Sequence, residues 1–269
     1  MRLIALLCTI LAIIMIADPL AAEVIYFDSL DSKLKVSGWL FMPKDASAPV
    51  PAMVVMHGTS GIDSRTLYFA DELPKLGIAA LLVDYKTGVF TSPSNRPQSD
   101  VFLPVAFAAL KQLSANPKID NNKIGIMGFA LGGQLTLAST LKDNIDKWLG
   151  NDKTGFKLHL AYYPGCKYFI NKLKSAIVKD SPIKLYYGTA DSYGEGEFCP
   201  KLREELNDRN FKSADFVSYE GATTGFDGLY PVSYFDPLAI NERCVIQPNE
   251  KYTNSSHKDA LRWIKGNLN

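Results

Sequence analysis

The sequence predicts an α/β protein with a mostly parallel central sheet and helices on both faces. Short runs that are wholly apolar, such as 52–56, are typical of strands buried on both faces. Stretches of helical length with a periodic apolar face, such as 100–115, separate these runs. Alternation of this kind favours a sheet covered on both sides. The 269 residues, 47% of them apolar, suit one large domain with a substantial core.

The first half of the chain begins with a hairpin. Apolar residues alternate with polar ones in 33–42, and a turn at 30–32 separates this strand from another at 23–29. The buried run at 52–56 is followed by a helix at 67–76, which ends at Gly77, a residue suited to a helix C-terminus. A buried strand at 79–85 and the helix at 100–115 complete this half.

The second half repeats the alternation. Its expected elements are a strand at 123–129, a helix at 131–141, strands at 158–163 and 183–187, a helix at 200–207, a strand at 215–219 and a terminal helix at 256–268. Sheets of this kind bind ligands beyond the carboxyl ends of their strands. Any site is therefore expected in the loops that follow the strands.

The N-terminus reads as a secretory leader. Arg2 precedes an apolar stretch at 3–17, and the small pair Ala21–Ala22 follows. An uncleaved anchor is disfavoured, because a spanning helix needs roughly 20 apolar residues. We expect a signal peptide at 1–22, cleavage near Ala22, and a single domain at 23–269. The protein is then secreted or periplasmic, without a stable membrane anchor after cleavage.

The charge and the residue spacing exclude several kinds of partner. The formal net charge is +1, with no basic stripe to hold a phosphate backbone, so nucleic acid is not expected to bind. No group of His, Cys or carboxylate residues has the spacing of metal ligands. No cofactor is expected.

The strand at 123–129 leads into a glycine-rich turn. The chain reads Gly-Phe-Ala-Leu-Gly-Gly over 128–133, in the strand–turn–helix context of the nucleophile elbow Gly-x-Ser-x-Gly. The glycines are needed because side chains beside the apex would collide with the neighbouring strand and helix. Here the apex is Ala130, which has no atom that can attack a carbonyl carbon.

Three more loops match the same fold. His57-Gly58-Thr59 follows the strand at 52–56, where a second oxyanion donor belongs. Asp191 follows the strand at 183–187, and Thr224 lies in the loop after the strand at 215–219. The chain order of these positions is that of α/β-hydrolases, namely nucleophile, acid and base.

With these motifs the sequence resembles the dienelactone hydrolase family over nearly all of the mature chain. The similar segments are the His-Gly loop, the stretch 119–133, the Gly-x-x-Asp turn and the segment 219–227. The resemblance implies an α/β-hydrolase fold and an enzyme that opens esters or lactones with a Cys or Ser nucleophile. When the catalytic residues of the family are mapped onto this sequence, the nucleophile position is Ala130, the acid is Asp191, and the histidine position is Thr224. The oxyanion donors are the N–H groups of Leu131 and Thr59.

Three histidines and one serine are candidate replacements for the missing groups. His57 is expected to orient the oxyanion loop, His159 to be a core residue, and His257 to be exposed at the start of the last helix. The Ser60 hydroxyl is expected to bond backbone rather than act as a nucleophile. Asp191 has two interpretations that the sequence does not separate, a remnant catalytic acid or a cap for backbone amides.

Three cysteines remain after the leader. An exported protein with three thiols is expected to contain one disulfide. In the frame of the family, Cys166 and Cys199 follow neighbouring strands at the same rim of the sheet, so we expect them to pair. Cys244 lies in the segment 229–255, which is long enough to cover the mouth of a pocket.

Two functions follow from these residues. The first is a pseudo-hydrolase that binds a small ester, lactone or carboxylate, or serves a protein partner, without cleaving its ligand. The second is an active ester or lactone hydrolase whose catalytic groups have moved elsewhere. The retained Asp191 and the family resemblance favour the second. The absence of a nucleophile and a histidine at Ala130 and Thr224 favours the first.

Overall fold

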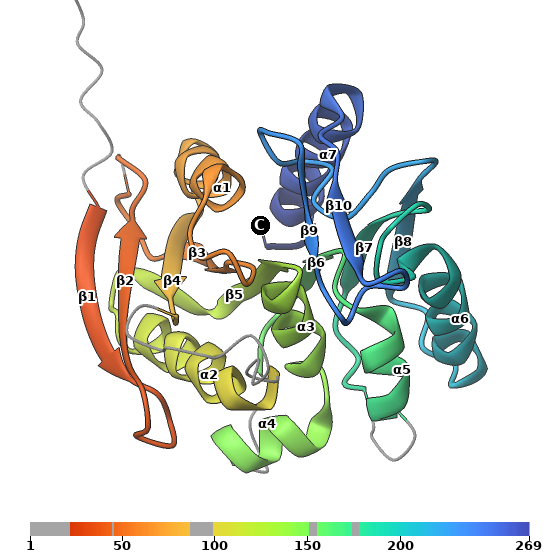
Figure 1. Ribbon diagram of the computed structural model, residues 1–269. Helices are drawn as coiled ribbons and strands as arrows, with labels where there is room; N and C mark the ends of the chain where they lie inside the picture. Colours follow the sequence, from red (N-terminus) through yellow and green to blue (C-terminus); the bar gives the residue numbers. More distant parts are fainter. Residues whose placement is uncertain (1–21, 45, 87–98, 151–154, 174–177, 269) are drawn as a thin grey trace, which may run out of the picture.

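The computed structural model describes residues 22–44, 46–86, 99–150, 155–173 and 178–268. The expected leader therefore falls outside the described residues, except for Ala22. Figure 1 shows a central sheet between two layers of helices. Eight strands form this sheet in the order β1-β2-β4-β3-β5-β6-β7-β8. They are β1 (Ala22–Asp28), β2 (Lys35–Phe41), β3 (Val50–Met56), β4 (Ala79–Asp84), β5 (Ile119–Phe129), β6 (His159–Tyr162), β7 (Ile183–Gly188) and β8 (Ala214–Tyr219).

The sheet is mostly parallel. β1 pairs with β2 and β2 pairs with β4 in antiparallel fashion, while every pairing from β4 through β8 is parallel. The predicted hairpin and the predicted fold class are confirmed. All the parallel strands end at the same edge of the sheet, so the loops after β3, β5, β7 and β8 share one side of the molecule.

Helices cover both faces of the sheet. They are α1 (Ser64–Lys75), α2 (Ser99–Ala115), α3 (Leu131–Ala138), α4 (Lys142–Leu149), α5 (Cys166–Leu173), α6 (Glu195–Asp208) and α7 (Glu250–Leu268). α1 and α7 lie on one face, and α2 to α6 lie on the other (Figure 1). Within the described part of the chain, none of these helices is both long and apolar enough to span a bilayer.

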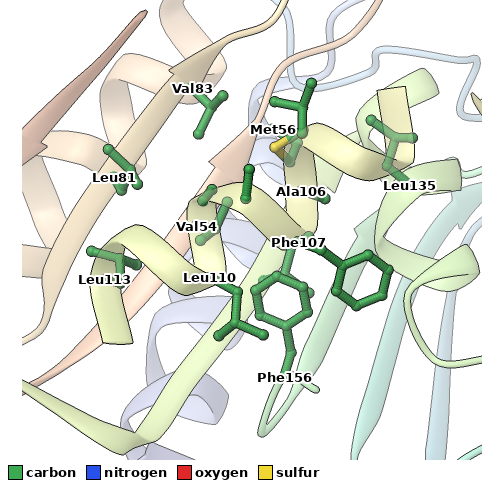
Figure 2. Packing of buried hydrophobic residues seen from close by; sticks show 14 of the residues in the cluster. Val54, Met56, Leu81, Val83, Ala106, Phe107, Leu110, Leu113, Leu135 and Phe156 are labelled. Carbon is green, nitrogen blue, oxygen red and sulfur yellow. The ribbon is translucent and has the colours of Figure 1, made fainter. Parts of the chain in front are cut away.

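The strand side chains alternate between the two helix layers. Val54 and Met56 of β3 pack into the cluster under α2, whereas Met53 and Val55 pack into the cluster under α1 and α7. Figure 2 shows the first of these clusters, in which side chains of β3 and β4 lie against α2. Because both faces are buried, β3 is apolar throughout its central part, as the sequence pattern indicated.

The element boundaries differ where polar side chains bond to the backbone. α1 begins at Ser64, three residues before the predicted start, because Asp63 and Thr66 form a capping box. The helix predicted at 131–141 ends at Ala138. The hydroxyls of Ser139 and Thr140 donate to carbonyls of the preceding turn at 2.7 and 2.6 Å. A separate helix, α4, follows.

Four elements were not predicted: α4, α5 and the strands β9 (Val232–Phe235) and β10 (Arg243–Ile246). β9 and β10 form a separate two-stranded antiparallel sheet. They lie within the segment 229–255, which the sequence analysis left without an assigned structure. α7 starts at Glu250 rather than at 256, and Asn249 accepts the Tyr252 N–H there at 3.1 Å.

The contact of α3 with the sheet leads to a prediction about stability. A Cβ added to Gly132 would lie 2.2 Å from the Met56 carbonyl oxygen, a backbone atom that cannot rotate away. We expect Gly132→Ala to lower the free energy of unfolding by at least about 3 kcal/mol, measured by urea denaturation. Gly266→Ala is the matched control, because its Cβ would meet no atom within 4 Å. It should raise stability by about 0.5–1 kcal/mol. Equal effects of the two substitutions would contradict the close contact.

Candidate active site

Ala130 forms the apex of a tight turn between β5 and α3. Its backbone has φ 48° and ψ −111°, a rare conformation for a residue with a Cβ. The Ala130 N–H donates to the Tyr162 carbonyl at 3.0 Å, and the Ala130 carbonyl accepts from the Gln134 N–H at 2.9 Å. The methyl group makes no capping bond. The backbone therefore holds the apex conformation, independently of the side chain at this position.

Backbone N–H groups point toward the apex from the first turn of α3. Ala130 is the N-cap of α3, so the Leu131 N–H belongs to the turn in which helices leave N–H groups without intrahelical partners. The positive end of the helix dipole lies here as well. A Cβ on Gly58 would lie 3.6 Å from the Ala130 Cβ, so the loop at 57–59 is adjacent to the elbow. The loop at 57–59 and the start of α3 are therefore neighbours, and the two expected oxyanion donors, Leu131 and Thr59, lie in these two segments.

The acid position and the histidine position are in contact. The Thr224 hydroxyl donates to Oδ2 of Asp191, and Oδ1 of the same carboxylate accepts the Tyr193 N–H at 2.7 Å. Asp191 and Thr224 are 5% and 8% exposed, so this pair is largely shielded from water. The carboxylate both caps a backbone amide and faces the histidine position. The two interpretations of Asp191 are therefore compatible with each other.

Burial dominates the electrostatics of this pair. It raises the pKa of Asp191 to about 6, although the hydrogen bonds from Thr224 and Tyr193 oppose the shift. Glu195 lies nearby at the start of α6, and burial together with the charge of Asp191 raises the pKa of Glu195 well above its ordinary value. The Glu195 carboxyl accepts the Cys166 N–H at 3.0 and 3.1 Å. Two buried carboxyl groups are thus close to each other without a cation between them.

His57 is held by the protein core. Its ring stacks on Tyr85 at a centroid distance of 4.0 Å, and its Nδ1 lies 2.6 Å from the Gly58 carbonyl oxygen. Because a carbonyl only accepts, Nδ1 carries the proton. Burial lowers the pKa of His57, which favours the neutral ring. These contacts suit a residue that orients the loop at 57–59.

The other two imidazoles are buried in the core. His159 starts β6 at the amino-terminal edge of the sheet, where its Nδ1 is 3.1 Å from the Ser181 hydroxyl. Burial lowers its pKa to about 3. The expectation that His257 is solvent-exposed was wrong, because His257 is only 7% exposed. α7 begins seven residues before it, so His257 lies on the inward face of the helix and stacks on Tyr68 at 4.3 Å.

A buried polar network was missed by the sequence analysis. Arg65 donates to Asp63 and to the Tyr163 hydroxyl at 3.0 Å, and Tyr163 donates to Asp227 at 2.7 Å. Oδ2 of Asp227 lies 3.5 Å from Nε2 of His257. The members come from α1, the end of β6, the loop after β8 and α7. Local sequence patterns do not predict such contacts, because Arg65 and Tyr163 are 98 residues apart in the chain.

The network reaches the site through Arg65. Its guanidinium carbon lies 5.9 Å from the centre of the Phe129 ring, next to the apex residue. Its Nη1 would lie 3.2 Å from a Cβ on Gly225, next to Thr224. The guanidinium therefore occupies the space between the elbow and the histidine loop. The raised pKa of Arg65, which the neighbouring Tyr163, Asp63 and Asp227 support against burial, keeps it charged.

The cysteines pair as expected in the structure. The sulfur atoms of Cys166 and Cys199 are 2.07 Å apart, and Cys244 is free and buried. Within the described residues, Cys166, Glu195 and Cys199 form a group with closely spaced potential metal ligands. In the disulfide the two sulfurs are bonded to each other, so they offer no thiolate to a metal ion.

The segment 229–255 packs against the acid loop. The Ile240 N–H donates to the Ser192 carbonyl at 2.9 Å, and the Val245 N–H donates to the Ser192 hydroxyl at 2.9 Å. Thr224 forms an isolated parallel bridge with Ile246. The β9–β10 hairpin thus lies over the loops that carry Asp191 and Thr224.

The sheet order, the strand–turn–helix elbow and the acid loop after β7 together define an α/β-hydrolase fold. The model of the dienelactone hydrolase family matches residues 36–266. The chain belongs to this family.

Solved structures have a similar fold. A dienelactone hydrolase-like promiscuous phosphotriesterase from metagenomic libraries has a TM-score of 0.66 and 18% identity, covering 93% of this chain and 100% of that one. Esterase 2 of Thermogutta terrifontis has a TM-score of 0.63 and 15% identity, covering 90% and 91%.

Two curated proteins match shorter stretches. The quorum-quenching protein AidA of Acinetobacter baumannii is 30% identical over 131 residues, which are 47% of this chain and 41% of AidA. The esterase FrsA of Photorhabdus laumondii is 29% identical over 113 residues, which are 40% of this chain and 27% of FrsA. The match thus spans less than half the length of either relative.

The pKa of Asp191 leads to a prediction about pH. The folded protein holds this proton up to about pH 6, whereas the ordinary pKa of an aspartate side chain is 3.8. Between pH 3.8 and about 6 the folded state therefore binds more protons than the unfolded state. As a result, the free energy of unfolding falls as the pH rises through this range. Asp191→Asn removes the charge and should flatten that part of the slope. At pH 7.5 the free energy of unfolding of this variant should exceed that of the wild type by on the order of 2 kcal/mol.

Urea denaturation between pH 4 and 7.5 measures this difference. Asp208→Asn, at an exposed position in α6, is the control and should keep the slope of the wild type. A slope in Asp191→Asn equal to that of the wild type would show that Asp191 does not cause it.

Proposed function

We propose that this member of the dienelactone hydrolase family is a pseudo-hydrolase, which binds a small ester, lactone or carboxylate and does not cleave it. The observation that carries the proposal is the methyl group of Ala130 at an elbow that is otherwise complete. The apex has the positive φ of the turn, and the flanking glycines allow the close contact of α3 with the sheet. The frame of the site is intact, whereas its reactive side chain is absent.

Hydrolysis by the triad needs an attacking group and a proton acceptor. Ala130 provides no hydroxyl or thiol. The Thr224 hydroxyl donates to Asp191 and does not accept protons at neutral pH. In triad enzymes, loss of the nucleophile or the histidine alone costs about 10⁶ in turnover, and loss of both costs little more. Turnover by this route is therefore negligible under the proposal.

Ligand binding depends on groups that these two substitutions leave in place. Oxyanion donors are backbone N–H groups, here those of Leu131 and Thr59, so they do not depend on the apex side chain. The N-terminus of α3 favours a negatively charged or polarised oxygen. Arg65 adds a positive charge between the elbow and the histidine loop. A carbonyl or carboxylate oxygen is the ligand group that this environment suits.

The alternative is an active hydrolase with relocated groups. The family membership and the names of relatives, which include esterases, favour it. Among the described residues, however, the imidazole that a hydroxyl contacts is His159, and it lies at the edge of the sheet opposite the elbow. The pseudo-hydrolase is therefore the better-supported function.

The proposal includes the location of the protein. The leader-like residues 1–22 and the Cys166–Cys199 pair together favour a secreted or periplasmic protein in an oxidising compartment. A small-molecule ligand is the preferred partner and a protein partner is the alternative. Nucleic acid is not expected, given the net charge of +1.

An esterase assay with four proteins tests the proposal. The substrates are short p-nitrophenyl esters, and the proteins are the wild type, Asp191→Asn, Ala130→Ser, and Ala130→Ser with Thr224→His. We expect background rates from the first three, because none of them combines a nucleophile with an imidazole. The double variant should exceed background by at least about 10², since it restores both groups on an existing frame.

Binding is measured separately, by calorimetric titration of the wild type with butyrate and with a short lactone. Thermal unfolding of each variant establishes that it is folded. Wild-type turnover that Asp191→Asn abolishes would overturn the proposal in favour of the active hydrolase. An inactive double variant, together with no binding of either ligand to the wild type, would overturn the assignment of this loop cluster as a ligand site.

A further inference from the structure

The segment that contains the β9–β10 hairpin carries most of the exposed large hydrophobic residues in the described part of the chain. Twelve large hydrophobic residues are exposed among all the described residues, and eight of them fall within 229–245. We call these eight the hairpin surface: Leu229, Tyr230, Val232, Tyr234, Phe235, Leu238, Ile240 and Val245. Phe235 and Tyr230 are 71% and 74% exposed. A contiguous stretch of this kind is typical of an interaction site.

One edge of β9 has no partner. β9 pairs with β10 on one side, and no other described strand pairs with it. All four of its residues are exposed, and none of them is charged. Proteins usually protect such edges with charged residues, proline or a covering element, because an open edge pairs readily with another strand.

The hydrogen-bond pattern shows which groups face this open edge. The Asp236 N–H donates to the Glu242 carbonyl at 2.9 Å, so residues 236 and 242 form a hydrogen-bonded pair. Hydrogen-bonded pairs alternate with non-hydrogen-bonded pairs along an antiparallel ladder. Tyr234 and Cys244 are therefore the next hydrogen-bonded pair. The N–H and C=O groups of Ser233 and Phe235 therefore point away from β10. The Val245 N–H, which donates to Ser192 and not to β9, agrees with this alternation.

We infer that the hairpin surface is the interface of a homodimer, in which β9 pairs in antiparallel fashion with β9 of a second copy. Ser233 and Phe235 supply the outward-facing groups, so Ser233 of one copy pairs with Phe235 of the other. Tyr234 then lies opposite its own counterpart on the twofold axis. The two hairpins combine into one four-stranded sheet.

The charge of the surface fits a second copy. A twofold interface brings the same surface together with itself, so an excess of one charge would repel. The exposed ionic residues of 229–245 are Glu242 and Arg243, one of each sign, and Asp236 is buried. A membrane surface would be expected to carry several Lys or Arg residues instead. The hairpin surface thus favours self-association over lipid binding.

The size of the surface is also sufficient. Three aromatic and five aliphatic side chains at these exposures offer on the order of 900 Å² over both faces of the hairpin, compared with about 800 Å² per partner in stable interfaces. The interface does not depend on whether the Ala130 site cleaves or only binds a ligand. It places the second copy beside the acid loop, because Ile240 bonds to Ser192.

Sedimentation velocity of the purified protein from 1 to 100 µM tests the inference. We expect a dimer that dissociates at low concentration. Ser233→Pro removes an outward-facing N–H and leaves the backbone bonds between β9 and β10 in place, although it also removes the hydroxyl that accepts the Arg243 Nε–H at 2.6 Å. Phe235→Lys places a charge on the open edge. Each should weaken dimerisation at least about 100-fold.

Tyr26→Lys is the matched control, since Tyr26 is 79% exposed on β1, the edge strand of the main sheet. It should leave dimerisation unchanged. Circular dichroism establishes that each variant is folded.

Hydrogen exchange provides a second readout. Protection of the Ser233 and Phe235 amides should rise with protein concentration, while protection of the Tyr234 amide should not. A wild type that is monomeric at 100 µM would overturn the inference, as would a dimer that both β9 variants retain. Dissociation by Tyr26→Lys would assign the interface to β1 instead. Flotation of a monomer with phosphatidylcholine or phosphatidylglycerol vesicles would assign the surface to lipid.

Discussion

The close contact between the backbone of α3 and the backbones of β3 and β5 determines the geometry of the whole site. At Gly132 and Gly128 the two layers approach so closely that a Cβ would overlap carbonyl groups. This contact fixes where α3 starts and forces the apex residue to a positive φ. It also brings the start of α3 next to the backbone of Met56 and His57. None of these features requires a particular side chain at the apex, so the frame persists when the apex is alanine.

The parts of the fold that were predicted correctly are those in which burial determines the sequence locally. β3 is apolar because both of its faces are covered, and the elbow glycines are needed because backbones touch there. β9 has the opposite character. Its four residues are exposed and mixed in polarity, so no alternation or apolar run indicates a strand. His257 was misplaced for a related reason, since the first turns of α7 are polar and concealed the start of the helix.

In the candidate site, too, some residues could be predicted from local sequence and others could not. The positions of Ala130, Asp191 and Thr224 follow from motifs after strands, and the structure places all three on loops at one edge of the sheet. The chain from Arg65 through Tyr163 and Asp227 to His257 depends on contacts between distant segments, which no local spacing encodes. Sequence patterns thus place these three residues on loops after strands, whereas the polar surroundings can be described only from the fold.

The hydrogen bond between Thr224 and Asp191 has a consequence for how this protein can change over time. In an active triad the buried carboxylate is hydrogen-bonded to an imidazole. Loss of that imidazole would leave the carboxylate without a partner and would lower the stability of the protein. Here a hydroxyl already satisfies the carboxylate. A serine arising at position 130 would gain nothing without a histidine, and a histidine arising at position 224 would gain nothing without a nucleophile. Under the proposed function, either change alone is therefore neutral or costly, because triad chemistry needs both groups together.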